Sequence, residues 1–523
     1  MNAAFARLIG VLALAIAGSS RASTHYYVDA SRSDDLGAGT NWATAKKVIQ
    51  SAIDLTLAGD TVFVTNGDYS TGGLTNYPTG SILTTRVALV SAITVRSVNG
   101  PAVTRIVGTR DGDGCGPAAV RGAYLANNAA LIGFTITNGA TLDVNDTKNG
   151  INGGGAFLNG VSAYVSNCVF LDNRSFSYGA GLYGGKAYGC TFAHNRGSGG
   201  GAAASAVLYA CTTVWNYASS GPGSNIGGGG LFISTAYDSL IASNTANGDG
   251  GGTHRTDLSN CVVIANSATN ATSDGGGVAR GTIRNCLVAD NYAGEIGGGM
   301  SGISWPCLAY NTTFSRNRSG SYAGAFYNGT LYNCTLVGNQ TAGTGGGLMT
   351  STAYNTLIAG NEAGSVGGGA YGSTLLNCTV VFNRARGTSW RPGGGGIHDC
   401  ISSNSIVYFN EAPPDTATNI LCYGVTNIAY SCSTPLPPGD FNIEDNPLFV
   451  EPGDGYGTNH VAGHYPLRGR SRCVDAALLF PWMLPGDGAG RDRDLNGKPR
   501  VRGSQPDIGA YECIPDGTVI SIR

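Results

Sequence analysis

The chain has 523 residues, of which 83 are glycine and only 12% are charged, and its formal net charge is −2. Ordinary soluble domains contain about twice that share of charged residues, so the surface of this protein is unusually neutral. Such a surface argues against nucleic acid as a partner and against electrostatic attachment to a membrane, and it suits a neutral partner such as a glycan.

Residues 1–22 predict export. Arg7 precedes an apolar run from Leu8 to Ala17, and the small residues after it suit cleavage near Ala22, which is the layout of a secretory signal peptide. The apolar run is too short to span a bilayer, and no later segment has the length and apolar character of a transmembrane helix. We therefore expect an exported protein, in the periplasm, on the cell surface or in the extracellular medium.

Residues 23–139 predict an N-terminal cap and the first, irregular coils of a solenoid. Asn41 can cap a short helix whose apolar residues between Ala45 and Leu57 repeat at helical spacing. This helix would cover the open end of the solenoid, where apolar side chains and strand edges would otherwise meet water. The strands expected after it are Thr61–Thr65, Arg86–Val90 and Thr94–Ser97.

Residues 140–420 repeat at intervals of roughly two dozen residues, with one asparagine per repeat and a glycine cluster at the start of each. A period this short, without a helical pattern inside it, leaves a parallel β-helix or a leucine-rich horseshoe. Glycine opposes the short helix that a horseshoe needs, so we expect an all-β, right-handed parallel β-helix. The repeating asparagines are Asn173, Asn195, Asn216, Asn244, Asn266, Asn291, Asn317, Asn339, Asn361, Asn383 and Asn410.

Equivalent residues of a parallel β-helix stack about 4.8 Å apart. The repeating asparagines should therefore hydrogen-bond to one another and to turn backbone, as residues of the fold and not of a catalytic site. Five positions before each asparagine stands a cysteine, serine or threonine, so we expect the cysteines of this row to be packed, reduced thiols. They are Cys168, Cys190, Cys211, Cys261, Cys286, Cys334 and Cys378.

The remaining cysteines are out of phase with that row, and four of them lie beyond the repeats. Residues 421–523 predict an irregular C-terminal cap, which disulfides could staple in an exported protein. A bridge between Cys422 and Cys432, or between Cys473 and Cys513, is plausible, although sequence cannot give the pairing.

Two segments of the mature chain resemble known families. Tyr26–Asp29, Gly39–Trp42 and Gly59–Val64 are similar to the N-terminal edge of exported β-helix proteins of the pectin lyase-like superfamily. Each repeat alternates a glycine triplet with an apolar-x-x-Asn element such as Phe170–Asn173, which resembles the repeats of the adhesin-like polymorphic outer membrane proteins.

The tail carries a third resemblance. Asn446–Val450, Asp492–Gly497 and Asp507–Glu512 are similar to the C-terminal region called choice-of-anchor Q in bacterial surface proteins. Together the resemblances imply a right-handed β-helix at the cell surface. They leave activity open, because the pectin lyase-like superfamily includes polysaccharide lyases, hydrolases and non-catalytic surface proteins.

A lyase of that superfamily would need a basic residue to abstract a proton beside a uronate carboxylate, with calcium held by acidic side chains. The best local group for this role is His254, Arg255, Asp257 and Arg280. A hydrolase would need two carboxylates, and Asp249 with Asp274 one repeat later is the obvious pair. The alternative for both groups is solvated charges in turns.

A row of aromatic residues lies two positions after the glycine clusters, next to a row that is reliably apolar. Because neighbouring residues of a strand point to opposite faces, the aromatic row should lie outside if the apolar row lies inside. Exposed rings along a rigid strip could stack on sugar rings or contact a protein partner. The residues proposed for glycan binding are Phe157, Tyr183, Phe232, Tyr327 and Tyr371.

The tail also contains half of a calcium loop. Asp492, Asp494 and Asn496, followed by Gly497, match the start of the D-x-D-x-N-G pattern, but the expected glutamate is replaced by Gly503. Calcium is the one cofactor that the sequence suggests, and the alternative is a turn braced by aspartate and arginine.

These patterns favour a secreted or cell-surface β-helix protein without catalytic activity, with an adhesin-like or polysaccharide-binding face. The alternative is a polysaccharide lyase or glycoside hydrolase, and a purely structural surface role is third. The expected partner is a polysaccharide, or a glycan or protein of a surface.

Overall fold

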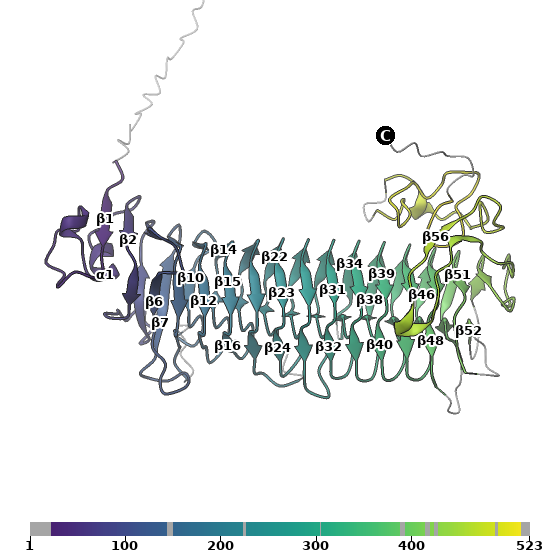
Figure 1. Ribbon diagram of the computed structural model, residues 1–523, viewed down its shortest axis with the longest axis horizontal. Coiled ribbons are helices and arrows are strands. Elements are labelled where there is room, and N and C mark those ends of the chain that lie inside the picture. Colours follow the sequence, from purple (N-terminus) through teal and green to yellow (C-terminus); the bar gives the residue numbers. More distant parts are fainter. Residues whose placement is uncertain are drawn as a thin grey trace, which may run out of the picture.

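The computed structural model describes residues 22–143, 150–222, 226–303, 305–387, 393–413, 419–422, 427–486 and 490–513. Residues 1–21 of the expected signal peptide lie outside these ranges. The described chain winds into a long parallel β-helix, and its C-terminal segment lies against the side of the last coils (Figure 1). The predicted all-β, right-handed parallel β-helix is therefore confirmed.

Each coil carries three or four short strands, which pair in parallel with those of the coils before and after. In one middle coil these are β21 (Leu231–Phe232), β22 (Thr235–Tyr237), β23 (Leu240–Ala242) and β24 (Thr245–Ala246). They belong to sheets that we name C, A, B and D, of 14, 16, 15 and 9 strands. Sheets A, B and C run almost the whole length of the helix, whereas sheet D spans β16 (Arg196–Gly197) to β48 (Arg384–Ala385).

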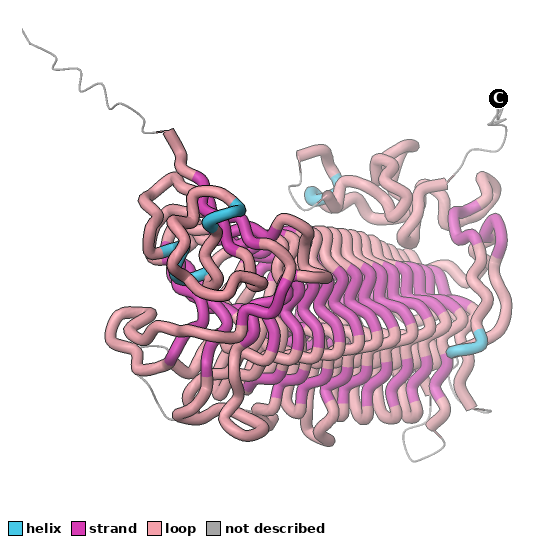
Figure 2. The backbone as a smooth tube through the Cα atoms, turned by 60° about the vertical axis from the view of Figure 1, so that its left-hand side comes forward, coloured by secondary structure: helices cyan, strands magenta, loops and turns pink. Residues whose placement is uncertain are grey.

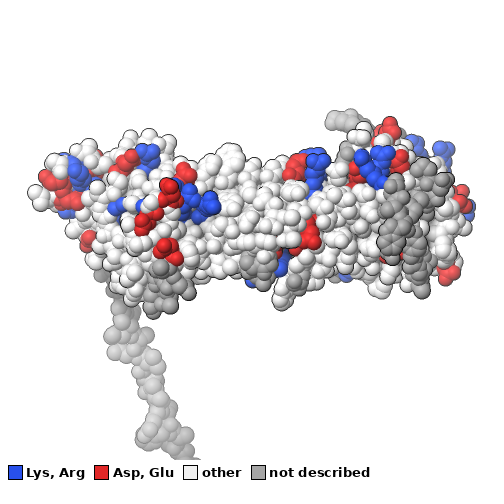
Figure 3. Space-filling model, turned by 90° about the horizontal axis from the view of Figure 1, so that it is seen from below, with Lys and Arg blue, Asp and Glu red and all other residues white. Residues whose placement is uncertain are grey.

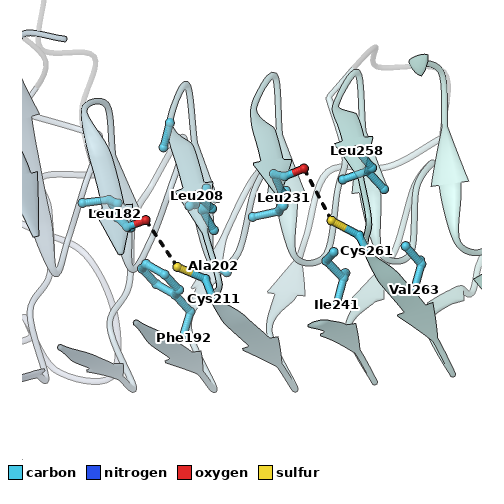
Figure 4. Close-up of a cluster of buried hydrophobic side chains, with 14 of the residues drawn as sticks. Leu182, Phe192, Ala202, Leu208, Cys211, Leu231, Ile241, Leu258, Cys261 and Val263 are labelled. Atoms are coloured by element: carbon cyan, nitrogen blue, oxygen red, sulfur yellow. Dashed lines mark hydrogen bonds between the residues drawn. The ribbon is translucent and has the colours of Figure 1, made fainter. Parts of the chain in front are cut away.

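The interior of the helix is filled by the middle residue of each strand in sheets A and B and by the first residue of each two-residue strand in sheet C. Leu208 of sheet A, Ile241 of sheet B and Leu231 of sheet C have no exposed surface. Figure 4 shows these side chains pointing towards one another across the coil. The residues next to these inward positions face outward. The alternation along each strand therefore also decides which residues form the outer rows of the sheets.

The repeating asparagines form the predicted ladder at the corner between sheets B and D. Asn291, which is 1% exposed, represents the row. Its backbone N–H and its Nδ2 both donate to Oδ1 of Asn317, at 3.1 and 3.0 Å, and Nδ2 also donates to the carbonyl oxygen of Val263 at 3.0 Å. The same three bonds recur from coil to coil, so each amide satisfies buried backbone groups that would otherwise lack partners.

The predicted row of packed thiols is confirmed at the corner between sheets A and B. The thiol of Cys211 donates to the carbonyl oxygen of Ala187 at 3.5 Å, and that of Cys261 to Ala236 at 3.4 Å (Figure 4). Where serine replaces cysteine, its hydroxyl accepts a backbone N–H from the preceding coil, as Ser239 does from Cys211 at 3.0 Å. The row therefore needs a small polar or thiol side chain and not a disulfide.

The bridges considered for the C-terminal cap are not formed among the described residues, where Cys422, Cys432 and Cys473 are free thiols. Cys400 and Cys422 extend a second row of small residues between sheets C and A, in which Ser373 donates its backbone N–H to the sulfur of Cys400 at 3.5 Å. Cys432 lies beside Cys473, whose thiol raises the pKa of Cys432. The stacking of coils decides these neighbours, and spacing along the chain does not reveal them.

The predicted N-terminal helix is present and shorter than expected. Asn41 caps a 3₁₀ turn, η1 (Trp42–Thr44), by accepting the N–H of Thr44 at 3.0 Å. The helix itself, α1, spans Ile49–Ile53, because Lys46 pairs with Val28 of the first strand and interrupts the helical run. Apolar residues of α1 are buried against the first coils, as the capping role requires.

The C-terminal segment, residues 427–513, closes the last coil and then folds back along the flank of the helix (Figures 1 and 2). Outward-facing Leu357, Val381 and Ile406 of sheet B are buried beneath it. Its own strands β55 (Phe449–Glu451) and β56 (His464–Leu467) pair antiparallel and contribute to the same apolar cluster. Two further 3₁₀ turns, η2 (Gly457–Asn459) and η3 (Pro481–Met483), complete it.

A second row of asparagines anchors this segment. These residues sit one position before the small-residue row, with positive φ angles near 50°, a conformation that asparagine tolerates. Asn333 donates to the carbonyl oxygen of Gly490 at 3.0 Å, Asn355 to that of Arg493 at 2.8 Å, and Asn404 to that of Leu478 at 2.8 Å. The amide row thus holds the C-terminal segment on the flank of the helix.

Replacing a ladder amide should destabilise the protein far more than replacing an exposed one. For Asn291→Ala we expect a loss of about 3 kcal/mol in the free energy of unfolding, because the bonds to Val263, Asn317 and Asn266 vanish and leave buried groups unpaired. Asn285→Gly is the matched control, since this side chain is exposed and its backbone suits glycine. Guanidinium denaturation measures both variants, and equal losses would contradict the ladder's role.

Candidate functional site

The structure brings together only part of the predicted lyase group. His254 ends β25 (Thr253–His254) on the outer side of sheet C, and Arg280 follows β29 (Val278–Ala279) one coil later. Asp257 instead begins β26 (Asp257–Ser259) in sheet A, where its exposed carboxylate accepts the backbone N–H of Thr282 at 2.9 Å. Arg255, in the turn between the two strands, is exposed. Asp257 is therefore a brace of sheet A and not a neighbour of His254.

The stacked acid pair joins His254 and Arg280 on the side of sheet C. Oδ1 of Asp249 accepts the backbone N–H of Asp274 at 3.2 Å. Burial raises the pKa of Asp274 to about 7, and the charges of the neighbouring Asp249 and Glu295 contribute to this rise. Burial also raises the pKa of Asp249. A carboxyl that keeps its proton near neutral pH beside a second carboxyl is the kind of pair that serves acid and base catalysis.

His254, on the same side of sheet C, is fully buried. Burial lowers its pKa to about 3, and the charges of Arg280 and Arg255 act in the same direction, so the imidazole is neutral at physiological pH. Neither ring nitrogen has a hydrogen-bond partner among the described residues. Because a general base must reach the proton that it abstracts, a fully buried ring does not fit that role in this conformation.

The predicted aromatic strip is not a continuous exposed surface. Phe157 and Phe232 lie on the outer side of sheet C, as the pleat predicts, but each is only 4% exposed. Phe157 packs on Tyr183 at 5.1 Å, and Phe232 packs against Tyr178 at 5.2 Å. Tyr183, Tyr327 and Tyr371 are half-buried. The prediction was wrong for the two phenylalanines because neighbouring side chains and turns cover this face.

The longest run of stacked rings lies on the outer face of sheet A, where Tyr188 is exposed and the other rings are half-buried. The last residues of successive strands form a row that contains six tyrosines, which we call the tyrosine ladder. Within each half of the row, neighbouring ring centroids are 4.8 to 5.2 Å apart and nearly parallel. The ladder consists of Tyr188, Tyr209, Tyr237, Tyr310, Tyr332 and Tyr354, at the ends of β14 (Lys186–Tyr188), β18 (Val207–Tyr209), β22, β34 (Cys307–Tyr310), β38 (Gly329–Tyr332) and β42 (Thr352–Tyr354).

A sequence signal for this ladder existed. Each of its tyrosines stands two residues before a member of the small-residue row, for example Tyr209 before Cys211 and Tyr332 before Cys334. The small residue marks the corner between sheets A and B, so the position two residues earlier is the last outward-facing position of sheet A. Counting two residues back from each small residue at this corner therefore identifies the row of tyrosines.

The C-terminal segment meets the end of the tyrosine ladder. The guanidinium of Arg491 lies 4.9 Å from the ring centre of Tyr354, and Trp482 makes an edge contact with the same ring at 5.3 Å. Cation–π and aromatic contacts of this kind favour the folded-back position of the segment. One end of the ladder is therefore closed by the chain itself.

A pocket of about 580 Å³ lies beside the ladder, between the C-terminal segment and the corner of sheets A and B. Asn311 and Asn333, which directly follow Tyr310 and Tyr332 in the chain, form part of its wall, so pocket and ladder adjoin. We call it the flank pocket. Its lining is mainly amide, hydroxyl and guanidinium groups, which come from Asn311, Thr313, Asn333, Thr335, Arg493 and Asn496.

The residues expected to bind calcium form a braced turn. Asp494 is 1% exposed, and its carboxylate accepts backbone N–H groups from Asn496, Lys498 and Glu512 at 3.0, 2.6 and 2.9 Å. Asp492 contributes a backbone carbonyl to Arg500, and the Asn496 side chain is exposed in the flank pocket. Within the described ranges no group of three or more His, Cys, Asp or Glu side chains is placed to hold a metal ion. The calcium prediction gains no support.

No family model and no curated protein matches the chain. Solved structures that it is similar to include the pectate lyase Pel9A, with 12% identity over 95% of this chain and 98% of the other, at a TM-score of 0.25. The A-module of the mannuronan C-5 epimerase AlgE4 of Azotobacter vinelandii shows 13% identity over 77% and 99%, at 0.27. The Dettilon tailspike protein shows 13% identity over 67% and 68%, at 0.31.

These values are too low to carry an argument about activity, which must come from the site. The resemblances to polymorphic outer membrane protein repeats and to choice-of-anchor Q stay predictions. Across the described ranges, no helix is long and apolar enough to cross a membrane.

The raised pKa of Asp274 predicts a pH-dependent gain of stability on its replacement. The carboxyl titrates near pH 7 in the folded protein and near its ordinary value of 3.8 when unfolded. As pH rises from about 4 to about 7, the unfolded state ionises first, so the wild-type protein loses stability in that window. Asp274→Asn should be more stable than wild type by up to about 4 kcal/mol above pH 7, and about equal to it near pH 4.

Chemical denaturation at a series of pH values measures this difference. The control is Asp257→Asn, because the Asp257 side chain is exposed. A difference between Asp274→Asn and wild type that does not change between pH 4 and pH 7 would show that the carboxyl is not desolvated in the folded protein.

Proposed function

We propose that this protein is an exported, non-catalytic β-helix protein that binds polysaccharide along the tyrosine ladder and the flank pocket. The observation that carries the proposal is their continuity: a row of stacked rings on sheet A adjoins a pocket of about 580 Å³ whose wall bears amide and hydroxyl groups. Saccharides present both apolar ring faces and many hydroxyls, and a site for them needs aromatic surface beside hydrogen-bonding groups.

The charge distribution supports a neutral ligand. On the face that Figure 3 shows, charged side chains form a few separate groups, with uncharged stretches of the coils between them. The flank pocket itself combines amides and hydroxyls with Arg493, whose side chain is exposed. A surface of this kind attracts partners by shape and hydrogen bonding and not by a long-range electrostatic field.

The rigidity of the tyrosine ladder also supports the proposed binding function. The ladder rings are fixed by stacking on one another, and the backbone beneath them is fixed by parallel pairing in sheet A. Binding to side chains that are already ordered costs less conformational entropy than binding to mobile ones. An adhesin-like contact with a surface glycan would use the same rows.

A second candidate function, glycoside hydrolysis, is favoured by the acid pair Asp249 and Asp274. The pKa of Asp274 near 7 would let one carboxyl act as acid while the other acts as base or nucleophile. Both side chains are less than a tenth exposed, so a substrate could reach them only after the surrounding turns move. The lyase alternative is weaker, since His254 is fully buried and Asp257 belongs to another sheet.

The test uses the full mature chain with neutral and acidic polysaccharides in affinity gel electrophoresis, together with an assay for new reducing ends and unsaturated uronates. We expect retardation by at least one polysaccharide and no turnover. Asn311→Ala, which removes an amide from the flank pocket, should weaken binding several-fold.

The matched control is Asn167→Ala, because Asn167 occupies the same outer asparagine row near the start of the repeats, away from the flank pocket. Turnover that is lost in Asp274→Asn would establish the hydrolase in place of the binding protein. The absence of both retardation and turnover would leave a structural role.

A further inference from the structure

The tyrosine ladder has one break. Strand pairing places Tyr237, Ser259, Arg284 and Tyr310 at equivalent positions of four successive coils. Three rings precede this point and three follow it, so Ser259 and Arg284 interrupt an otherwise regular row of tyrosines. A serine in a row of tyrosines leaves the volume of a phenol ring unfilled at the surface of the sheet.

Arg284 does not fill that volume. Its guanidinium carbon lies 3.8 Å from the ring centre of Tyr310, on the side that faces Ser259. The side chain is thus held against Tyr310 by a cation–π contact and turned away from Ser259. One planar face of the guanidinium is covered by the ring, and the other is presented to the break.

The opposite wall of the break is the ring of Tyr237. One of its faces stacks on Tyr209 at 5.1 Å. The other face points towards Ser259, and it has no ring or cation stacked on it among the described residues. Elsewhere in the ladder, Tyr209 and Tyr332 each lie between two rings, and Tyr310 is covered by Arg284. At the two ends, Tyr354 is contacted by Arg491 and Trp482, and Tyr188 meets Tyr164 edge-on at 5.9 Å.

The break has the dimensions and the polarity of a site for one sugar ring. Tyr237 and Arg284 are two coils apart, about 10 Å, which accommodates a saccharide ring between them. Exposed carboxylates stand on both sides of Ser259: Asp257 precedes it by two residues on the same face, and Asp238 accepts the amide of the adjacent Asn260 at 3.1 Å. These groups accept hydrogen bonds from sugar hydroxyls, and Arg284 donates them.

We propose that this break binds one ring of a neutral polysaccharide, with the apolar face of the ring on Tyr237 and its hydroxyls towards Arg284, Asp257 and Asp238. The inference rests on the proposed function and adds a place and a ligand class to it. Neutral sugar is favoured over uronate because two carboxylates and one guanidinium border the site, and a third carboxylate would be repelled.

The test closes the break. Ser259→Tyr restores a continuous row of rings, and since tyrosine occupies the equivalent position in the coil before, the variant is compatible with the fold. The matched control is Ser166→Tyr, which adds a tyrosine to the same row at its upstream end, next to Tyr188. Isothermal titration with a soluble neutral β-glucan, mannan and xylan, and with polygalacturonate, measures binding by each variant and by wild type.

We expect wild type to bind at least one neutral polysaccharide, Ser259→Tyr to bind it at least tenfold more weakly, and Ser166→Tyr to bind it as wild type does. Unchanged binding by Ser259→Tyr would overturn the inference while leaving the proposed function intact. Tighter binding of polygalacturonate than of every neutral polymer would overturn the ligand class. If wild type binds no polymer in either assay, the proposed function fails as well.

Discussion

Every other feature of this molecule depends on the buried asparagine ladder between sheets B and D. Each amide accepts the backbone N–H of the coil before, and its own Nδ2 donates both to the next amide and to a strand carbonyl. A one-residue slip of any coil would leave all of these groups unpaired in the interior, which makes such a slip very costly. The ladder therefore fixes the register of the stack.

Because the register is fixed at one corner, the number of residues in a coil can vary outside that corner. Successive ladder asparagines are 22 residues apart at Asn339 and Asn361 and 28 apart at Asn216 and Asn244, yet both pairs make the same amide bonds. The additional residues of the longer coil lie in the sequence between its sheet D strand, β20 (Tyr217–Ala218), and β21. Glycine makes the return possible, since Gly275 has a φ of +64° and a Cβ on Gly276 would meet the carbonyl oxygen of Tyr292 at 2.4 Å.

The same register builds the surface on which the proposals rest. Because coils stack without slipping, tyrosines at one position of sheet A meet face to face, and a single serine produces a break of defined width. The outer asparagine row works in the same way: in the last coils it holds the C-terminal segment through Asn333, Asn355 and Asn404, and this contact encloses the flank pocket. The proposed binding surface is thus a by-product of the regularity that stabilises the core.

The sequence by itself determined the helix, because buried polar residues at a fixed interval need partners at that interval, and only a stack of coils supplies them. It also determined the reduced state of the cysteines in phase with the ladder, since serine and threonine share their positions, and the presence of a capping helix. These conclusions depend on local periodicity and on the need to satisfy backbone groups, both of which are visible along the chain.

Only the tertiary structure decided which outward rows remain exposed. Phe157 and Tyr188 belong to equally regular outward rows, yet the first is 4% exposed and the second 36%, because the rings of Tyr124 and Tyr183 and the guanidinium of Arg121 cover Phe157. The sequence also did not reveal the spatial neighbours of Cys432 and Asp257, or that the C-terminal segment folds back along the helix. Exposure and contact depend on groups that are distant in sequence, and a repeat pattern carries no information about them.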